Sequence, residues 1–145
     1  MGIAVTLGYL LDTNHVGRAV TPGSIVRQRI TELRLAGAKV GTCVPVLCEI
    51  EAGIQQVNQA DAYRLNLNRL LRQVRVWPID NSTAALYGII HHDLRRRGRV
   101  LSQIDMMLAA LARQMNLTLV TTDQDFAALP DLQSENWLTG SAKIQ

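Results

Sequence analysis

The sequence is poor in cysteine, in glycine and proline, and in long hydrophobic runs, and each shortage excludes a class of protein. Its two cysteines, Cys43 and Cys48, have no neighbouring cysteine or histidine cluster, so we expect neither a disulfide framework nor a zinc site. We interpret both as small, reduced core residues. Ten glycines and four prolines among 145 residues exclude collagen-like and low-complexity chains. No segment approaches the roughly 18 to 20 consecutive apolar residues of a membrane-spanning helix.

The remaining composition is that of an ordinary globular domain. Hydrophobic residues make up 48% of the chain and charged residues 19%, and a chain of this length can bury a sizeable core. We therefore expect one domain across residues 1–145. The N-terminal segment MGIAVTLGYLLDTN lacks the basic stretch of an export signal and predicts a strand, so we expect a cytoplasmic protein without membrane contact.

Arginine carries almost all of the positive charge. Only two of the 15 basic residues are lysine, and the formal net charge is +3. A guanidinium group can bind a phosphate through two parallel hydrogen bonds, which an ammonium group cannot. No acid interrupts residues 62–79, which include four arginines, and a second cluster consists of Arg95, Arg96, Arg97 and Arg99. The clusters indicate either two solvated helix faces or a surface that binds a polyanion.

Apolar, strand-like runs alternate with helix-period segments of ten or more residues. The runs span residues 3–11, 40–44, 74–79 and 117–121. A short edge strand through Leu132 and Trp137, followed by a frayed tail, completes the pattern. The alternation predicts an α/β fold with a central, mostly parallel sheet of four or five strands.

Local signals predict where several helices begin and end. We expect helices to begin at Thr21 with Pro22 in the first turn, at Asp80 and at Ser102. Gly37 and Gly98 stand where two helices should end.

Acidic residues stand where a parallel α/β fold carries function, beyond the carboxyl ends of its strands. Asp12 follows the run YLL, and Asp123 ends LTLVTTD; either residue could instead cap the next helix or close a turn. Asp105 opens a strongly apolar helix, three residues after Ser102. That spacing resembles a capping box, and the helix dipole stabilises an acid in the first turn. Asp105 could therefore cap the helix, and this would not prevent it from having a chemical role as well.

Glu49 and Glu51 lie on the same predicted helix but face different sides of it. At about 100° per residue, Glu49 shares a side with Val46 and Ile50, whereas Glu51 lies about 200° away from Glu49. We therefore expect Glu49 to face inward, where a carboxylate is costly unless it is paired, protonated or bound to a cation. The alternative is a surface glutamate on a helix whose boundaries differ slightly.

The fold should bring Asp12, Glu49, Asp105 and Asp123 to one edge of the sheet. Four converging carboxylates repel one another unless divalent cations neutralise them. Oxygen ligands without cysteine or histidine favour magnesium or manganese over zinc. Without these acids the chain retains 15 basic and 8 acidic residues, a formal charge of +7. A metal-loaded acidic pocket in a basic body suits a phosphodiester substrate, because arginines hold the backbone while metals activate water.

Five segments in this order resemble the PIN-domain family, specifically the VapC-type toxins of prokaryotic toxin–antitoxin pairs. They are YLLDTNHV, CEIEAGI at Glu49, IDMMLAALA at Asp105, LVTTDQDF at Asp123, and ENW at residues 135–137. Together they span nearly the whole chain. The resemblance implies a parallel-sheet α/β/α sandwich and a magnesium- or manganese-dependent endoribonuclease.

The resemblance also implies roles for individual residues. Asp12, Glu49, Asp105 and Asp123 match the family's acidic metal-binding quartet, with Asp125 as a possible substitute for Asp123. Asn14 and Thr121 match polar residues that support the quartet by hydrogen bonding. His15, His91 and His92 lie outside these roles, and we interpret them as surface or packing residues.

The resemblance further implies an RNA substrate, a cognate VapB-type antitoxin as inhibitory partner, and a homodimer. The helix through Tyr63, Leu67, Leu70 and Leu71 could bind an antitoxin segment or a second copy, or could simply pack in the core. Two other functions stay open. One is a catalytically silent PIN-like module that binds RNA or protein; the other is a phosphotransfer enzyme with Asp12 as covalent acceptor.

Overall fold

The computed structural model describes residues 7–139, whose strands form one sheet. All pairings are parallel, in the order β3-β2-β1-β4-β5. The strands are β1 (Gly8–Leu11), β2 (Lys39–Cys43), β3 (Arg75–Trp77), β4 (Thr118–Val120) and β5 (Ser134–Glu135). The predicted parallel sheet is confirmed. The expected edge strand is only the short β5: Leu132 lies outside it and Trp137 belongs to a 3-10 helix. Strands β3 and β4 are shorter than their predicted apolar runs, β2 is as long as its run, and the tail after residue 139 lies outside the described residues.

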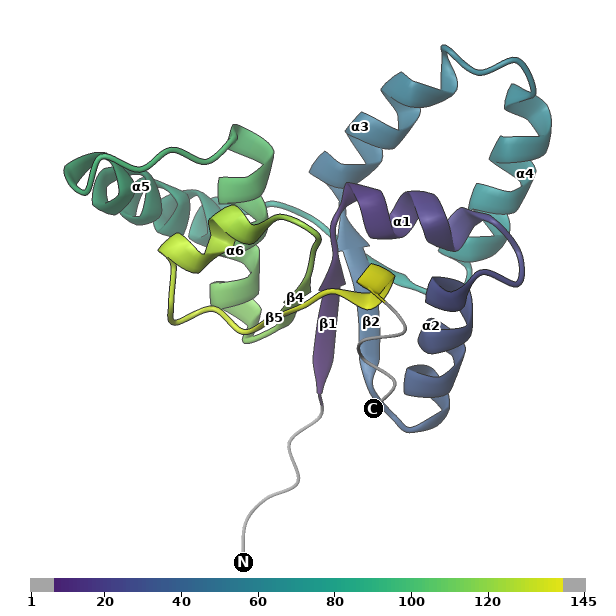
Figure 1. The fold of residues 1–145 in the computed structure, drawn as a ribbon, viewed down its shortest axis with the longest axis horizontal. Coiled ribbons are helices and arrows are strands. Elements are labelled where there is room, and N and C mark those ends of the chain that lie inside the picture. Colours follow the sequence, from purple (N-terminus) through teal and green to yellow (C-terminus); the bar gives the residue numbers. More distant parts are fainter. Residues whose placement is uncertain (1–6, 140–145) are drawn as a thin grey trace, which may run out of the picture.

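Helices connect the strands and cover both faces of the sheet. They are α1 (Thr13–Val20), α2 (Ile25–Leu35), α3 (Val44–Ile54), α4 (Ala60–Leu71), α5 (Asn81–Arg96) and α6 (Gln103–Met115), with short 3-10 helices η1 (Gln124–Ala128) and η2 (Trp137–Thr139). Figure 1 shows α5 and α6 on one side of the sheet and α1 and α2 on the other. Helix α1 packs against α2, α3 and α4.

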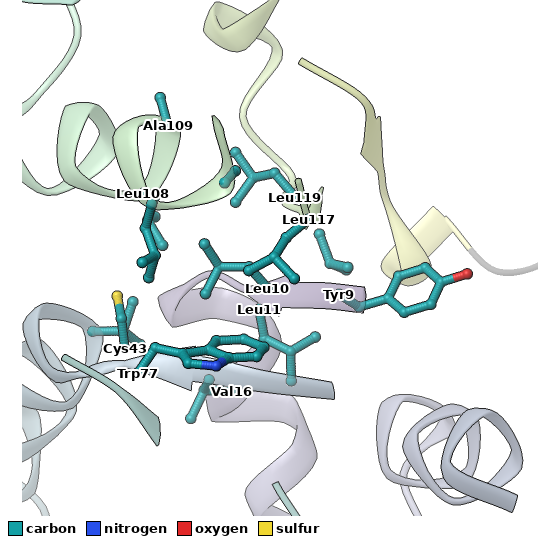
Figure 2. Close-up of a cluster of buried hydrophobic side chains, with 14 of the residues drawn as sticks. Tyr9, Leu10, Leu11, Val16, Cys43, Trp77, Leu108, Ala109, Leu117 and Leu119 are labelled. Carbon is teal, nitrogen blue, oxygen red and sulfur yellow. The ribbon is translucent and has the colours of Figure 1, made fainter. Parts of the chain in front are cut away.

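The core lies where the central strand β1 meets helices of both layers. Leu10 and Leu11 of β1 are fully buried, as is Leu108 of α6 (Figure 2). Burying a leucine side chain contributes roughly 2 kcal/mol. Gly41 of β2 is needed for close packing, because a Cβ there would lie 2.6 Å from the carbonyl oxygen of Arg75.

Several predicted helix ends are confirmed. Asp80 caps α5 in a capping box with Thr83, and Ser102 caps α6 by accepting a hydrogen bond from the backbone N–H of Asp105. Gly37 and Gly98 follow α2 and α5 with positive φ angles of 90° and 66°. Such a conformation favours glycine and allows the next backbone N–H groups to bond the last helical carbonyls.

Two expectations about local structure were wrong. Thr21 and Pro22 do not begin a helix: α1 ends at Val20, a turn follows, and Ser24 caps α2 by accepting from the backbone N–H of Arg27. A Thr-Pro pair suits the turn as well as a first helical turn, so the sequence signal was ambiguous. Cys43 is buried as expected, but Cys48 is exposed on α3 and is no core residue.

No helix within residues 7–139 is both long and apolar enough to cross a membrane.

Candidate active site

The acidic residues singled out above lie near the edge of the sheet beyond the carboxyl ends of its strands. Asp12 directly follows β1 and caps α1, while Asp123 follows β4 and caps η1. Asp105 lies in the first turn of α6, and Glu49 lies in the second turn of α3. The sheet order places β4 beside β1, so Asp12 and Asp123 reach the same edge although they are 111 positions apart in the sequence.

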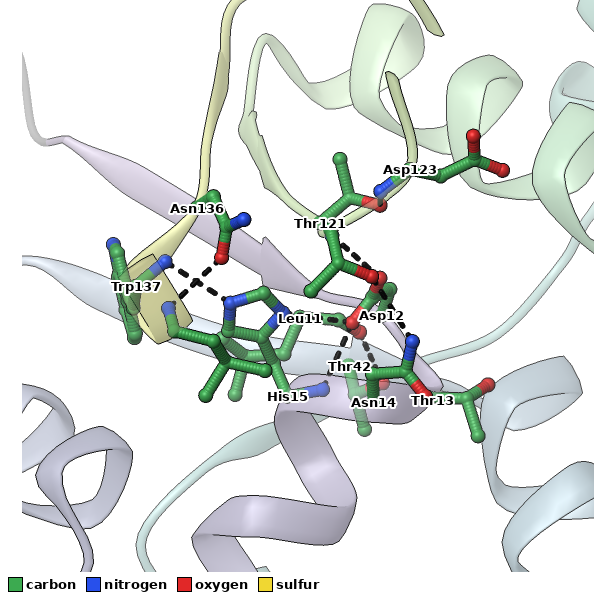
Figure 3. A network of polar contacts seen from close by, with 12 residues as sticks. Leu11, Asp12, Thr13, Asn14, His15, Thr42, Thr121, Asp123, Asn136 and Trp137 are labelled. Carbon is green, nitrogen blue, oxygen red and sulfur yellow. Dashed lines mark hydrogen bonds and ion pairs between the residues drawn. The ribbon is translucent and has the colours of Figure 1, made fainter. Parts of the chain in front are cut away.

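Asp12 is almost completely enclosed, with 7% of the residue exposed. Its Oδ1 accepts hydrogen bonds from the backbone N–H of His15 at 2.9 Å and from the ring Nδ1 of His15 at 2.8 Å. Its Oδ2 accepts from the backbone N–H of Thr122 at 3.3 Å, and the Thr121 hydroxyl also bonds the carboxylate. Burial raises the pKa of Asp12, but these hydrogen bonds outweigh it and hold the pKa below its ordinary value. At neutral pH Asp12 is therefore an ionised carboxylate whose orientation these hydrogen bonds fix (Figure 3).

His15 is the residue whose contact with the acidic site the sequence interpretation missed. Its imidazole is fully buried between the Asp12 carboxylate and the backbone of Trp137, whose N–H donates to Nε2 at 3.1 Å. The expected packing role is therefore only part of its function in the fold. The segment DTNHV places a histidine three residues after the helix cap, which was the available signal. The partner of its second nitrogen lies 122 positions away, so sequence patterns gave no sign of it.

Asp105 lies in a different electrostatic environment. Its pKa is raised to about 6, first because it is partly buried and then because the negative charges of Asp123 and Asp12 act on it, while the Ser102 hydrogen bond partly opposes the shift. Asp12, Asp105 and Asp123 thus share one electrostatic environment.

The predicted supporting residues lie beside this group. The Thr121 hydroxyl accepts from the backbone N–H of Asp123 at 3.0 Å as well as contacting Asp12. The Asn14 side-chain amide donates to the Thr122 hydroxyl at 3.0 Å. Asp125 is exposed, and its backbone N–H donates to the carboxylate of Asp123 at 2.8 Å. Thr121 therefore connects the turn after β4 to the end of β1.

Glu49 departs from the expectation that it faces inward. The buried side of α3 carries Val46, Ile50 and Ile54, whereas Glu49 is exposed. Helix α3 starts directly at the end of β2, and this start turns Glu49 to the flank that faces α1. There it accepts a hydrogen bond from the Thr13 hydroxyl. Glu51 points elsewhere and pairs with Arg64 through two hydrogen bonds of 2.9 and 2.7 Å.

The side chains that could bind a metal ion near this edge offer carboxylate, hydroxyl and amide oxygens. Oxygen ligands of this kind suit a hard divalent cation. The raised pKa of Asp105 points the same way, because a cation would relieve the repulsion that raises it. Among residues 7–139, however, no three histidine, cysteine or acidic side chains stand close enough together to form a ready ligand set. Magnesium does not need one, because it keeps several water ligands and commonly takes only one or two carboxylates directly.

The arginine cluster at the end of α5 is exposed. Arg97 is already engaged there, donating to Asp93 at 2.6 Å and to the carbonyl of Ala128 at 2.7 Å, so it ties α5 to η1. Arg95 and Arg99 line a cavity of about 370 Å³ that also includes Met106, the neighbour of Asp105 in the chain. His91 borders the same cavity and stacks on Tyr87, whereas His92 is exposed.

A larger cavity, of about 610 Å³, opens between α1, α3 and α4 on the side of Glu49. Its lining includes the polar or charged residues Thr13, Asn14, Arg18 and Glu49 and the apolar or aromatic residues Ile50, Ile54, Val57, Tyr63 and Leu138. Leu67 and Leu70 of α4 are buried in the core instead, and Leu71 is partly buried against it. The apolar side of α4 is thus largely used for internal packing.

Comparisons with known proteins agree with the resemblance stated above. A family model described as PIN domain matches residues 9–132. Ribonuclease VapC2 of Rickettsia felis is 25% identical over 130 residues, which cover 89% of this chain and 97% of the relative. Ribonuclease VapC5 of Mycobacterium tuberculosis is 30% identical over 93 residues, covering 63% and 69%.

Solved structures agree on the fold. The crystal structure of VapBC2 from Rickettsia felis bound to a promoter DNA fragment superimposes with a TM-score of 0.82 at 23% identity, covering 90% of this chain and 99% of that chain. The predicted PIN-like α/β/α architecture is thereby confirmed.

Proposed function

Because the chain belongs to the PIN-domain family, we propose that it is a divalent-metal-dependent endoribonuclease, the VapC-type toxin of a toxin–antitoxin pair. The names of the relatives, ribonucleases VapC2 and VapC5, support this activity. The observation that carries the proposal is the environment of Asp105. Burial first, and then the negative charges of Asp123 and Asp12 at the ends of β4 and β1, raise its pKa to about 6, and the part of the shift that comes from these charges suits a cation site.

Asp12, Asp105 and Asp123 would hold magnesium or manganese, with Glu49 contributing from the flank of α3. When bound, the cation lowers the pKa of water and stabilises charge on the leaving oxygen of a phosphodiester. Asp12 presents an ionised carboxylate whose hydrogen bonds keep it from rotating away. Thr121 and Asn14 hold the turn after β4 in place, and Asp125 remains a possible substitute for Asp123. No side chain is required as nucleophile.

Exposed arginines would hold the RNA backbone beside this site. Arg95, Arg96 and Arg99 are free of the internal contacts that engage Arg97, as far as the bonds within residues 7–139 go. Phosphate contacts of this kind position a substrate without reading its sequence. We also propose that the protein acts in the cytoplasm, where cellular RNA is available as a substrate.

A VapB-type antitoxin is the proposed inhibitory partner. Solved structures similar to this chain are VapBC complexes, which supports such a pairing. The 610 Å³ cavity offers an apolar surface next to Glu49 and Asn14 where a partner segment would block access to the acids. Adding the purified cognate antitoxin should stop RNA cleavage; unchanged turnover would contradict this part of the proposal. We also propose a homodimer, which sedimentation equilibrium tests directly.

The proposed activity is tested by incubating the protein with RNA in magnesium, in manganese and with EDTA, followed by sequencing of the RNA ends. Asp12→Asn and Asp105→Asn should each abolish metal-dependent cleavage. Glu51→Gln is the matched control, since Glu51 lies on the same helix as Glu49 but pairs with Arg64. Cleavage that survives both EDTA and the two aspartate substitutions would overturn the proposal.

The alternative is a catalytically silent module that binds RNA or protein. One observation favours it: residues 7–139 contain no preformed set of three metal-binding side chains. RNA binding that is unaffected by EDTA, together with intact RNA after prolonged incubation in magnesium and in manganese, would support this alternative.

A further inference from the structure

The imidazole of His15 joins two parts of the chain that are far apart in sequence. Its Nδ1 lies 2.8 Å from Oδ1 of Asp12, and its Nε2 lies 3.1 Å from the backbone nitrogen of Trp137. A backbone N–H can only donate, so Nε2 must accept and carries no proton. The ring proton therefore lies on Nδ1 and is donated to Asp12. The two contacts together fix a neutral ring in one tautomer.

This arrangement determines which carboxylate oxygen of Asp12 accepts the hydrogen bonds from His15. Oδ1 receives both the ring proton and the backbone N–H of His15, each at 2.9 Å or less. Oδ2 receives a longer bond of 3.3 Å from Thr122. His15 thus fixes the rotation of the carboxylate through Oδ1, while Thr121 and Thr122 also donate to the carboxylate.

The other side of His15 is held by the C-terminal segment, residues 134–139. The indole of Trp137 packs edge-on against the imidazole, with ring centroids 6.1 Å apart, and lies 5.8 Å from the ring of Tyr9. The guanidinium of Arg29 lies 5.6 Å above the indole, and the indole Nε1 donates to Glu135 at 3.0 Å. These contacts position the Trp137 backbone that in turn positions His15 (Figure 3).

We propose that His15 is a positioning residue for the acidic site: through one ring nitrogen it sets the orientation of Asp12, and through the other it anchors residues 134–139 beside the site. The inference deepens the proposed function and rests on it. Partners that orient a metal-binding side chain typically contribute 10- to 100-fold to metal affinity or activity. His15 touches neither substrate nor reacting atoms in this scheme.

Two substitutions separate the two contacts of the ring. In His15→Asn the amide nitrogen takes approximately the place of Nδ1 and can donate to Asp12, but the side chain is too short to reach Trp137. In His15→Gln the amide takes approximately the place of Nε2 and can accept from Trp137, but its donor no longer aligns with Asp12. Both replace the ring by a smaller amide, so the loss of packing is similar.

The readouts are manganese binding to the RNA-free protein by calorimetry, kcat and KM for RNA cleavage, and hydrogen exchange of the Trp137 amide. We expect His15→Gln to weaken manganese binding and lower kcat about 10- to 100-fold with little change in KM, while the Trp137 amide stays protected. His15→Asn should keep manganese affinity within about threefold of wild type but speed exchange at Trp137 at least tenfold. Ring nitrogen chemical shifts of the wild-type protein should report the Nδ1–H tautomer.

Equal losses in the two variants, following their thermal stability rather than the contact removed, would overturn the positioning role. So would a wild-type ring protonated on Nε2. If the wild-type protein neither binds manganese nor cleaves RNA, the proposed function fails. In that case the tautomer and the exchange of the Trp137 amide still decide whether His15 couples the C-terminal segment to Asp12.

Discussion

Asp12 and Asp105 belong to the same acidic edge, yet the protein treats their charges in opposite ways. Asp12 is the more deeply buried of the two, but donors from His15, Thr121 and Thr122 surround it, and its pKa is lowered. Asp105 is only partly buried and has the Ser102 cap for support, and its pKa is raised to about 6. Burial alone therefore does not decide the charge state: it raises the pKa of both groups, but hydrogen bonds reverse the shift at Asp12, whereas neighbouring anions add to it at Asp105.

The difference suggests a division of labour within the proposed site. The end of β1 is preorganised: its carboxylate is ionised and oriented before any ligand arrives. At the start of α6, Asp105 is repelled by the negative charges of Asp123 and Asp12, and a bound cation would relieve this repulsion. In the proposed site, an ionised and oriented Asp12 beside a destabilised Asp105 would favour binding of a cation.

Asp12→Asn is the strongest test of the preorganised side. The amide cannot accept from all the donors that surround Asp12, so unfolding in urea should show a loss of roughly 2 kcal/mol, within the range for hydrogen bonds to charged groups. Metal-dependent RNA cleavage should fall on the order of 1,000-fold, equivalent to about 4 kcal/mol of transition-state stabilisation. Unchanged stability would mean that the donors around Asp12 contribute little.

Thr121→Val tests whether donors hold Asp12 ionised. The substitution keeps the shape but removes the hydroxyl that bonds Asp12 and accepts from the backbone of Asp123. We expect a loss of about 1–2 kcal/mol in the free energy of unfolding. The pKa of Asp12, followed by NMR, should rise toward its ordinary value. A pKa that does not move would assign the lowering to His15 alone.

Asp105→Asn should change the free energy of unfolding in the opposite direction to Asp12→Asn: it should stabilise the metal-free protein. Because the folded pKa of Asp105 is raised from 3.8 to about 6, its ionisation destabilises the fold as pH rises across that interval, and the penalty is complete above pH 6. The variant should therefore gain stability relative to wild type on going from pH 4.5 to 7.5, on the order of 1 kcal/mol after allowance for partial exposure. The contribution of Asp12, whose folded pKa is lowered, is lost only at more acidic pH and does not interfere.

Thermal melts of both proteins in EDTA over this pH range measure the difference. Stability curves that stay parallel would show that Asp105 carries no such repulsion. Adding magnesium should stabilise the wild-type protein and leave Asp105→Asn nearly unchanged, because only the former gains a bound cation.

Glu51→Gln should have the smallest effect. Its pair with Arg64 is bidentate but lies in solvent, where such pairs contribute little. We expect cleavage within about twofold of wild type and a change in thermal midpoint of about 2 °C or less. A large loss of activity would show that α3 contributes to the site through its geometry rather than through Glu49.

Much of the fold follows from local sequence signals. These signals involve residues that are close together in the chain. They are the apolar runs at β1, β2, β3 and β4, the helix caps Asp80 and Ser102, and the glycines Gly37 and Gly98 that follow helices. The acids at the ends of β1 and β4 were predictable for the same reason, because strand ends and sheet order follow from the pattern.

The parts that escaped prediction depend on tertiary contacts. The direction of Glu49 is set by where α3 leaves β2, and a small change in helix start rotates a side chain by 100° per residue. The second contact of His15 comes from Trp137, at the far end of the described chain. Arg97 belongs to an exposed cluster by sequence, but the carbonyl of Ala128 happens to lie within its reach.

The pairing of β1 with β4 has a consequence for when the protein becomes active. Leu11 lies beside Val120, and β5 joins only after that, so the central strand acquires one of its two neighbours late in synthesis. A nascent chain on the ribosome would carry Asp12 without Asp105 or Asp123 beside it until α6, β4 and the following turn have been made. In the proposed function, RNA cleavage would therefore await synthesis of these later elements, which would give an inhibitor made alongside the chain time to bind first.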